Sequence, residues 1–258
     1  MSLLLDFLCR FGWGLAAALV LTPPAVVPAG FFRVNLLVVL GLATFAALVA
    51  RTTVPGPAWI VAALAAVAAW LGSVAWLGER TRAGVAFCAV TSLLLAAATV
   101  LVQGRPGADP AVVVALVSGL VSGCTVHAML LGHWYLNAPG MSVAALRRMI
   151  DLALAVWGAR LLLTLWLAAP SGGGGLMGGG ELIAGGELIA GGELTAGTTG
   201  LALAALRWLA GLVGLPVLLV MARKTLDIPN TQSATGILYV ACLAAILGEL
   251  TGQLLGPL

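Results

Sequence analysis

Charged residues are scarce in this sequence of 258 amino acids, which is 62% hydrophobic and only 8% charged. A soluble globular domain carries roughly a quarter charged residues, because water must wet its surface. A surface in contact with hydrocarbon needs no such cover, so the deficit favours an integral membrane protein. The net charge of +3 is too small and too scattered to indicate a nucleic-acid partner.

Motifs of metal, redox and hydrolytic chemistry are also missing. The four cysteines stand singly in apolar runs, without CxxC or CxxCH, which argues against c-type haem, zinc-finger and thioredoxin-like sites. Their simplest interpretation is that they are small buried hydrophobic residues. Because HExxH, GxSxG and paired Asp-rich motifs are absent, we predict no catalytic residue and rank an intramembrane enzyme last.

Long apolar runs fill most of the chain. A helix needs about 20 apolar residues to cross a bilayer, and eight stretches qualify. The N-terminal stretch has no basic start or small-residue cleavage site, so we expect a retained helix rather than a signal peptide. The predicted fold is all-α, a polytopic transmembrane bundle of about eight helices, at residues 7–27, 34–50, 58–78, 83–103, 110–136, 143–169, 200–222 and 232–255.

Small residues and one proline indicate how these helices pack. Gly119 and Gly123 in the fifth stretch, and Gly248 and Gly252 in the eighth, have the GxxxG spacing that lets helix backbones approach closely. Pro216 is expected to kink the seventh helix.

Basic residues fall unevenly on the two sides of the expected bundle, seven on one side and three on the other. The richer side should be cytoplasmic, because positive residues stay inside. We therefore predict a multi-pass protein of the bacterial inner (plasma) membrane with both termini on the periplasmic side. The seven are Arg33, Arg80, Arg82, Arg147, Arg148, Arg223 and Lys224, and the three are Arg10, Arg51 and Arg105.

A glycine-rich segment at residues 171–200 interrupts the pattern, with GELIAG repeated and then varied as GELTAG. Its glycines disfavour a stable helix, since each costs about 1 kcal/mol relative to alanine. Glu181, Glu187 and Glu193 are its only charges. We expect a flexible loop between the sixth and seventh helices, with a short docking element as the alternative.

Three ionisable residues are predicted in the outer half of the bilayer: Arg160, Arg207 and Glu249. Such groups cost about 2.5–3.5 kcal/mol near the membrane centre, so those present are the best indicators of function. An Arg207–Glu249 or an Arg160–Glu249 pair would neutralise two of the three charges. The remaining guanidinium group then needs an acceptor, for which backbone carbonyls, water or an anionic lipid head group are open alternatives.

A second polar group is predicted near the inner interface, where the fifth and sixth helices form a hairpin. A histidine with a carboxylate there can exchange protons with a bound quinone, because imidazole titrates near neutral pH. In the alternative, Asp151 pairs with an arginine three or four residues earlier on its own helix, and His133 is an interfacial anchor. The candidates are His127, His133, Asp151, Arg147 and Arg148.

Haem and metal binding are disfavoured by geometry. His127 and His133 are six residues apart, which places them about 120° apart around the helix and about 9 Å apart along it. They cannot ligate opposite faces of one haem, and the sequence has no other histidine. Cys124 and His127 share a face but lack further ligands nearby, so no metal site is predicted. A quinone is the cofactor considered.

The function favoured by these patterns is an integral membrane subunit of a bacterial redox or respiratory-type complex. Eight helices with a histidine and an acid near one interface are similar to the quinol-interacting membrane-anchor subunits of bacterial respiratory oxidoreductases. That resemblance implies lipid contact, other protein subunits as partners, and help in forming a quinone pocket. A small solute transporter or channel is the alternative, as is a purely structural scaffold subunit. Transporters often have repeated halves, and residues 1–136 and 143–258 show no convincing similarity.

Overall fold

The computed structural model describes residues 2–105, 109–138, 141–168, 202–203, 205–228 and 230–255. Over these ranges the chain is helical and has no strand, which confirms the predicted all-α fold. The helices are α1 (Ser2–Leu21), α2 (Ala29–Thr53), α3 (Ala58–Leu77), α4 (Thr81–Gln103), α5 (Pro110–Asn137), α6 (Ala144–Ala168), the π-helix η1 (Arg207–Gly214), α8 (Leu215–Thr225) and α9 (Thr231–Leu254). The glycine-rich segment 171–200 lies outside the described residues.

Eight helices in the described ranges are long and apolar enough to cross a membrane, as predicted, with η1 and α8 forming one span. Their bounds differ from the expected ones most in the first two helices, since α1 begins at Ser2 rather than near residue 7 and α2 begins at Ala29 rather than near residue 34. α1 ends at Leu21 rather than near residue 27, because the ring of a proline such as Pro23 or Pro24 cannot continue a helix. Pro216, where a kink was predicted, lies in the first turn of α8, directly after the π-helix η1. At this place the chain changes from a π-helix to an α-helix.

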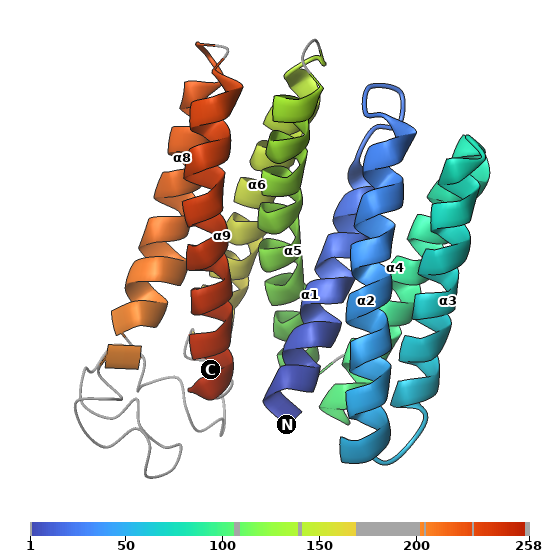
Figure 1. Cartoon of the computed structure of the whole chain (residues 1–258). Helices are drawn as coiled ribbons and strands as arrows, with labels where there is room; N and C mark the ends of the chain where they lie inside the picture. The colour runs from blue at the N-terminus through green and yellow to red at the C-terminus, as the bar shows by residue number, and fades with distance from the viewer. Residues whose placement is uncertain are drawn as a thin grey trace.

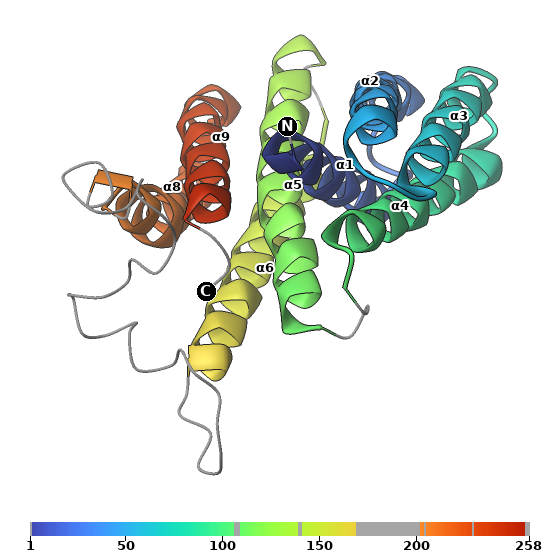
Figure 2. The same ribbon diagram turned by 90° about the horizontal axis from the view of Figure 1, so that it is seen from below.

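The helices form two groups of four (Figures 1 and 2). In the first group α1, α2, α3 and α4 form a ring, in which each helix contacts the next and α4 returns to α1. In the second group α5, α6, α8 with η1, and α9 form a ring of the same kind, which α9 closes against α5. Seen from below in Figure 2, the helices of both rings follow one another in the same rotational sense. The second group therefore repeats the arrangement of the first.

The two groups meet at α1 and α5, where glycines let the backbones touch. A Cβ atom added to Gly14 would overlap the backbone of Gly119, and one added to Gly123 would overlap the backbone of Gly14. The indole N–H of Trp13 donates to the Leu116 carbonyl across the same contact at 3.0 Å. The predicted close approach at Gly119 and Gly123 is confirmed, and its partner is α1.

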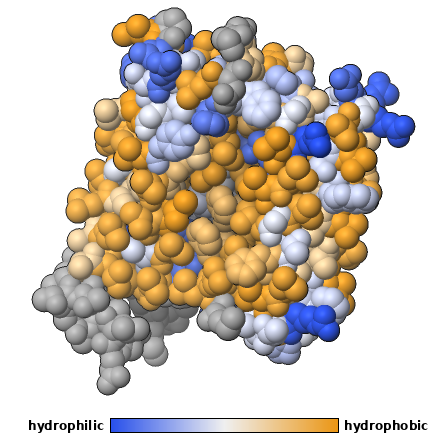
Figure 3. Space-filling view, in the orientation of Figure 1, coloured by the Kyte–Doolittle hydropathy of each residue, from blue (hydrophilic) through white to orange (hydrophobic). Residues whose placement is uncertain are grey.

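Apolar side chains cover the middle of the molecule. On the face in Figure 3 a broad hydrophobic band separates the more hydrophilic ends. Large apolar side chains such as Leu93, Leu162 and Trp166 are more than half exposed. An apolar surface of this extent would be unfavourable in water and is the one that lipid requires. The chain is therefore a multi-pass membrane protein.

Both ends of the described chain lie at the same end of the bundle (Figure 1), as an even number of spans requires. We call this the termini end. The opposite end, which holds the loops around residues 22–28, 78–80 and 226–230, carries the seven basic residues named above, and we call it the basic end. That the basic end faces the cytoplasm stays a prediction.

Candidate functional site

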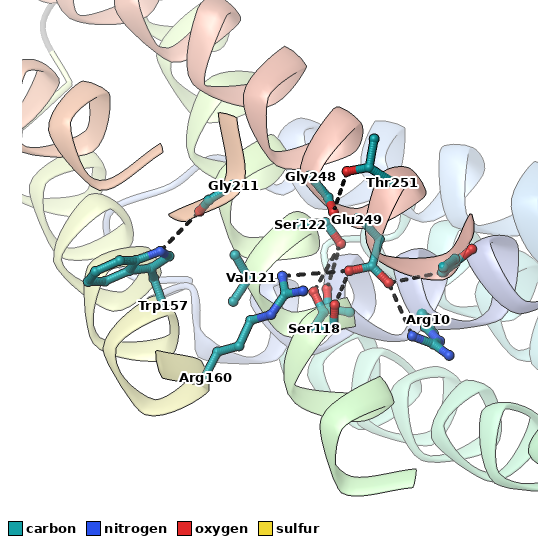
Figure 4. A network of polar contacts seen from close by, with 12 residues as sticks. Arg10, Ser118, Val121, Ser122, Trp157, Arg160, Gly211, Gly248, Glu249 and Thr251 are labelled. Atoms are coloured by element: carbon teal, nitrogen blue, oxygen red, sulfur yellow. Dashed lines mark hydrogen bonds and ion pairs between the residues drawn. The ribbon is translucent and has the colours of Figure 1, made fainter. Parts of the chain in front are cut away.

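A carboxylate lies almost completely buried in the part of the bundle nearer the termini end. Glu249 of α9 has only 2% of its side chain exposed. It accepts hydrogen bonds from Arg10 at 3.3 Å, from Gln253 at 3.0 Å and from the Ser118 hydroxyl, and it forms an ion pair with Arg160 at 3.7 Å. Figure 4 shows the two arginines reaching the carboxylate from opposite sides. The network joins α1, α5, α6 and α9.

Arg10 extends the network into the first helix. Its guanidinium also pairs with Asp6 one turn earlier, at 2.5 Å, and Asp6 accepts a hydrogen bond from Gln103 of α4. From the sequence Arg10 was counted only among the charges that determine orientation, and the structure adds that it takes part in an interior network, with its side chain only 15% exposed. The i, i+4 spacing of Asp6 and Arg10 was the available indication of an internal pair.

Close packing of η1 against α9 positions the second arginine. A Cβ atom on Gly248 would lie 2.7 Å from the Cα of Gly211, so the two helices cross where neither has a side chain. The Trp157 indole of α6 donates to the Gly211 carbonyl at 3.2 Å, which ties α6 to the same crossing. Arg160 lies one turn further along α6, and from there its guanidinium reaches Glu249.

Arg207 begins η1 and lies near this network without an ion pair in it. The charges of Arg160 and Glu249 both act on it. Of the two pairs considered from the sequence, the structure contains Arg160–Glu249 and does not contain Arg207–Glu249. Among the described residues no carboxylate forms a salt bridge with Arg207.

Arg207 leaves the charges around the network uneven. Among the described residues, the guanidinium groups of Arg10 and Arg160 balance the carboxylates of Asp6 and Glu249, and Arg207 adds a third positive group beside them. Ser118, Gln103 and Gln253 add hydrogen bonds but no charge. An uncompensated charge inside an apolar span is expensive, and such charges mark ion or substrate sites by default.

The quinone candidates at the basic end form a different arrangement from the expected one. Asp151 pairs with Arg223 of α8 at 2.7 Å, and Arg147 pairs with Asp227 at 3.0 Å. The predicted pairing of Asp151 with Arg147 or Arg148 is wrong, because α8 lies beside α6 and supplies a closer guanidinium group. Arg148 is exposed. These ion pairs fasten α6 to the turn that follows α8.

The two histidines lie in separate surroundings. His133 is exposed, and its Nδ1 lies 3.0 Å from the Tyr239 hydroxyl of α9. His127 is fully buried, with Nε2 2.7 Å from the Thr22 hydroxyl and the Phe31 ring against its edge. The Thr22 hydroxyl, which also lies within hydrogen-bond distance of the Ala18 carbonyl, is hydrogen-bonded to this Nε2 atom. This bond ties α5 to the end of α1.

The potential metal ligands are scattered. Among the described residues no three His, Cys, Asp or Glu side chains lie close enough to share an ion. All four cysteines are buried and unpaired. Cys124 is buried in the apolar core cluster.

These features define a class: a multi-pass helical membrane protein built of two similarly arranged four-helix groups, with an ion network buried beside their junction. Searches of protein-family models, curated proteins and solved structures found nothing that matches this chain. Its function is therefore argued from its own geometry.

Proposed function

We propose that this chain is a small membrane transport protein, in which the Glu249 network binds the moving solute or the coupled ion. The observation that carries the proposal is the burial of Glu249, at 2% exposure, among residues of four helices within the apolar spans. Ionisable side chains at such depth are rare, and they usually face a binding site or a transport path.

The arrangement of the helices supports this proposal. Many transporters consist of two repeats, which in some families are parallel and related by an axis along the membrane normal. Here α1–α4 and α5–α9 follow one another in the same order and sense, and α1 contacts α5 between them. The boundary between the two groups lies between α4 and α5, at residues 103–110. The sequence comparison of residues 1–136 with 143–258 therefore counted α5 in the first half, although it belongs to the second group.

The π-helix beside the network is a second support. π-helical segments are rare and frequently occur at functional sites. η1 spans Arg207–Gly214, and its Gly211 carbonyl accepts the hydrogen bond from Trp157. A wider helix that ends at Gly214, just before Pro216 of α8, can change its geometry more readily than a regular one, and transport requires such a change near the binding site.

Transport by the purified chain in proteoliposomes tests the proposal. Uptake of labelled phosphate, sulfate, an amino acid and a sugar is compared with uptake by empty liposomes, and at least one solute should enter faster. Glu249→Gln should lower that rate at least about tenfold, which requires the activation free energy of transport to rise by only about 1.4 kcal/mol. The matched control is Asp151→Asn, which also neutralises a paired carboxylate, but one that is half-exposed at the basic end. The transport rate of this variant should stay within about twofold of that of the unchanged chain.

Two results would contradict transport. In the first, none of the tested solutes enters the proteoliposomes faster than it enters empty liposomes, and neither do protons, whose entry is followed with an internal pH dye. The other is a Glu249→Gln variant that transports as fast as the unchanged chain, since the network would then have no part in the process.

A redox membrane subunit is the second candidate, and the contact between His133 and Tyr239 favours it. The imidazole and the phenol lie 3.0 Å apart on neighbouring helices, exposed toward the basic end of the apolar belt. Both groups can donate protons, and a quinone head group diffusing in the bilayer could meet them there. Asp151, which was expected beside His133, is paired with Arg223.

Quinone retention tests this second candidate. Protein purified in mild detergent should carry extractable quinone, and Tyr239→Phe should lower its amount at least about fivefold through loss of one hydroxyl donor. Tyr135→Phe is the matched control, because that hydroxyl bonds the Ser142 carbonyl instead. A quinone-free preparation, or equal retention by both variants, would speak against a quinone pocket, and partner subunits that co-purify would support the complex.

A further inference from the structure

The crossing of η1 and α9 brings Arg207 level with a position that has no side chain. The helices run antiparallel and touch at Gly211 and Gly248, where a Cβ atom on Gly211 would lie 3.2 Å from the Cα of Gly248. Arg207 lies four residues before Gly211, and Gly252 lies four residues after Gly248. Four residues are about one turn of α9 and slightly less than one turn of the π-helix η1, so Arg207 and Gly252 lie at about the same level beyond the crossing.

Arg160 reaches the same place from α6. Its Nη2 atom lies 3.9 Å from the position that a Cβ atom on Gly252 would take, and this is the nearest atom to that position. The space over Gly252 is therefore bordered by the Arg160 guanidinium group of α6, and Arg207 of η1 lies at about the same level across the crossing. The Arg160 side chain is 24% exposed, so the place is accessible from outside the bundle.

Both guanidinium groups have hydrogen-bonding capacity left. Each arginine offers five N–H donors. The 3.7 Å contact of Arg160 with Glu249 is long, because charge-assisted bonds of this kind measure about 2.7–2.9 Å. Glu249 is meanwhile shared with Arg10, Ser118 and Gln253. The carboxylate is well satisfied by these partners, whereas within the described part of the chain the Arg160 and Arg207 side chains donate no hydrogen bond shorter than the 3.7 Å contact.

An oxyanion satisfies both the charge and the donors. Among the described residues, the network and the neighbouring Arg207 together have one guanidinium group more than they have carboxylates, so a single anion would restore neutrality inside the apolar span. Planar guanidinium groups bind phosphate and carboxylate groups in a bidentate manner. Two such forks can use three or more acceptor oxygens, which a phosphate group offers and a carboxylate does not.

We infer that Arg160 and Arg207 together bind one phosphate-type oxyanion over Gly252. The phosphate can belong to a lipid head group or to a soluble solute, because both present the same oxygens to the two guanidinium groups. This inference goes beyond the proposed transport function and does not depend on it, since the anion binds whether or not it crosses the membrane.

Ligand-dependent stability, combined with native mass spectrometry, tests the site and shows whether the bound phosphate group comes from a lipid or from solution. The full chain is placed in nanodiscs of phosphatidylcholine, and its Tm is followed as inorganic phosphate replaces chloride at constant ionic strength. In the second arm phosphatidylglycerol is added to the nanodisc, and lipid retained on the released protein is weighed. A ligand that binds only the folded state raises the Tm as its concentration increases. A response in either arm supports the site and names its source.

Variants connect the response to these residues. Arg207→Gln should weaken the binding that responds at least about tenfold, since it removes charge-assisted hydrogen bonds. Arg51→Gln is the matched control: this arginine also lies near the termini end, but over the Trp59 ring, and its loss should leave affinity within about twofold. Gly252→Leu keeps every charge and should abolish binding by filling the space.

Glu249→Gln provides a test of opposite sign. Removing the competing carboxylate should strengthen anion binding, whereas a merely structural disturbance would weaken it. The inference is overturned if neither phosphate nor phosphatidylglycerol binds, or if Arg207→Gln binds as well as Arg51→Gln. Anion binding without uptake in proteoliposomes would leave the site intact and remove the transport proposal. If the chain takes up a solute, phosphate does not inhibit that uptake, and neither probe binds, the anion site is removed and the transport proposal stands.

Discussion

Replacing Gly123 with alanine is expected to destabilise the folded protein by about 3 kcal/mol or more. The added methyl group would overlap the backbone of Gly14 on α1. Backbone atoms cannot move aside as a flexible side chain can, so α1 and α5 would have to separate. This contact joins the two helix groups, and separating it would also draw Trp13 away from Leu116.

Thermal unfolding in one detergent, followed by tryptophan fluorescence, measures this effect. For a chain of this size 3 kcal/mol corresponds to a fall in Tm of about 6–12 °C. Gly41→Ala and Gly236→Ala are matched controls, because a Cβ atom at either position meets no atom within 4 Å. Their Tm should stay the same or rise, since alanine favours a helix by about 1 kcal/mol. A Gly123→Ala variant as stable as the controls would show that the helices do not touch there.

The transmembrane fold could be predicted from the sequence because hydrocarbon imposes a simple requirement. Every backbone group in a span must be bonded within its helix, so length and apolarity alone reveal the span. Helix ends were less predictable where two features compete. The apolar residues up to Val27 suggested a longer first helix, but Pro23 and Pro24 end it.

The candidate site was predictable only in part. The rarity of charge within apolar runs indicated Arg160, Arg207 and Glu249, and the structure pairs two of them, Arg160 and Glu249. Arg10 was missed as a member, because counting positive charges for orientation treats a buried arginine like an exposed one. Its burial depends on α1 lying beside α5 and α9, and span prediction does not specify which helices are neighbours.

Partner choice between helices explains the error at Asp151. Spacing along one helix favoured Arg147 or Arg148 as its partner, at about 0.2–0.5 kcal/mol for such a pair. So small a preference is outweighed when another helix supplies a well-placed group, as α8 does with Arg223 at 2.7 Å. Likewise, the repeat of four helices became visible only through the order of neighbouring helices, because apolar spans resemble one another in composition whatever their origin.

Neutralising Glu249 should cost about 3–5 kcal/mol of stability, the largest loss expected from a single polar side chain in this protein. Glu249→Gln leaves Arg160 without an ion pair among the described residues and leaves Arg10 with Asp6 alone. Arg160→Gln should cost less, since the carboxylate keeps its bonds to Arg10, Ser118 and Gln253 and the charge excess falls.

A double-mutant cycle separates this network from general disturbance. The double variant Glu249→Gln/Arg160→Gln should lose less stability than the sum of the losses in the two single variants, by at least about 1 kcal/mol. The reason is that the second change removes the charge that the first left uncompensated. The same cycle on Asp227 and Arg147, which are 49% and 39% exposed, should give a coupling of about 1 kcal/mol or less. Tm values and denaturant midpoints in one detergent measure both cycles. Strict additivity at Glu249 and Arg160 would mean that their charges do not interact, and the buried network would then no longer explain why α6 holds an arginine at this depth.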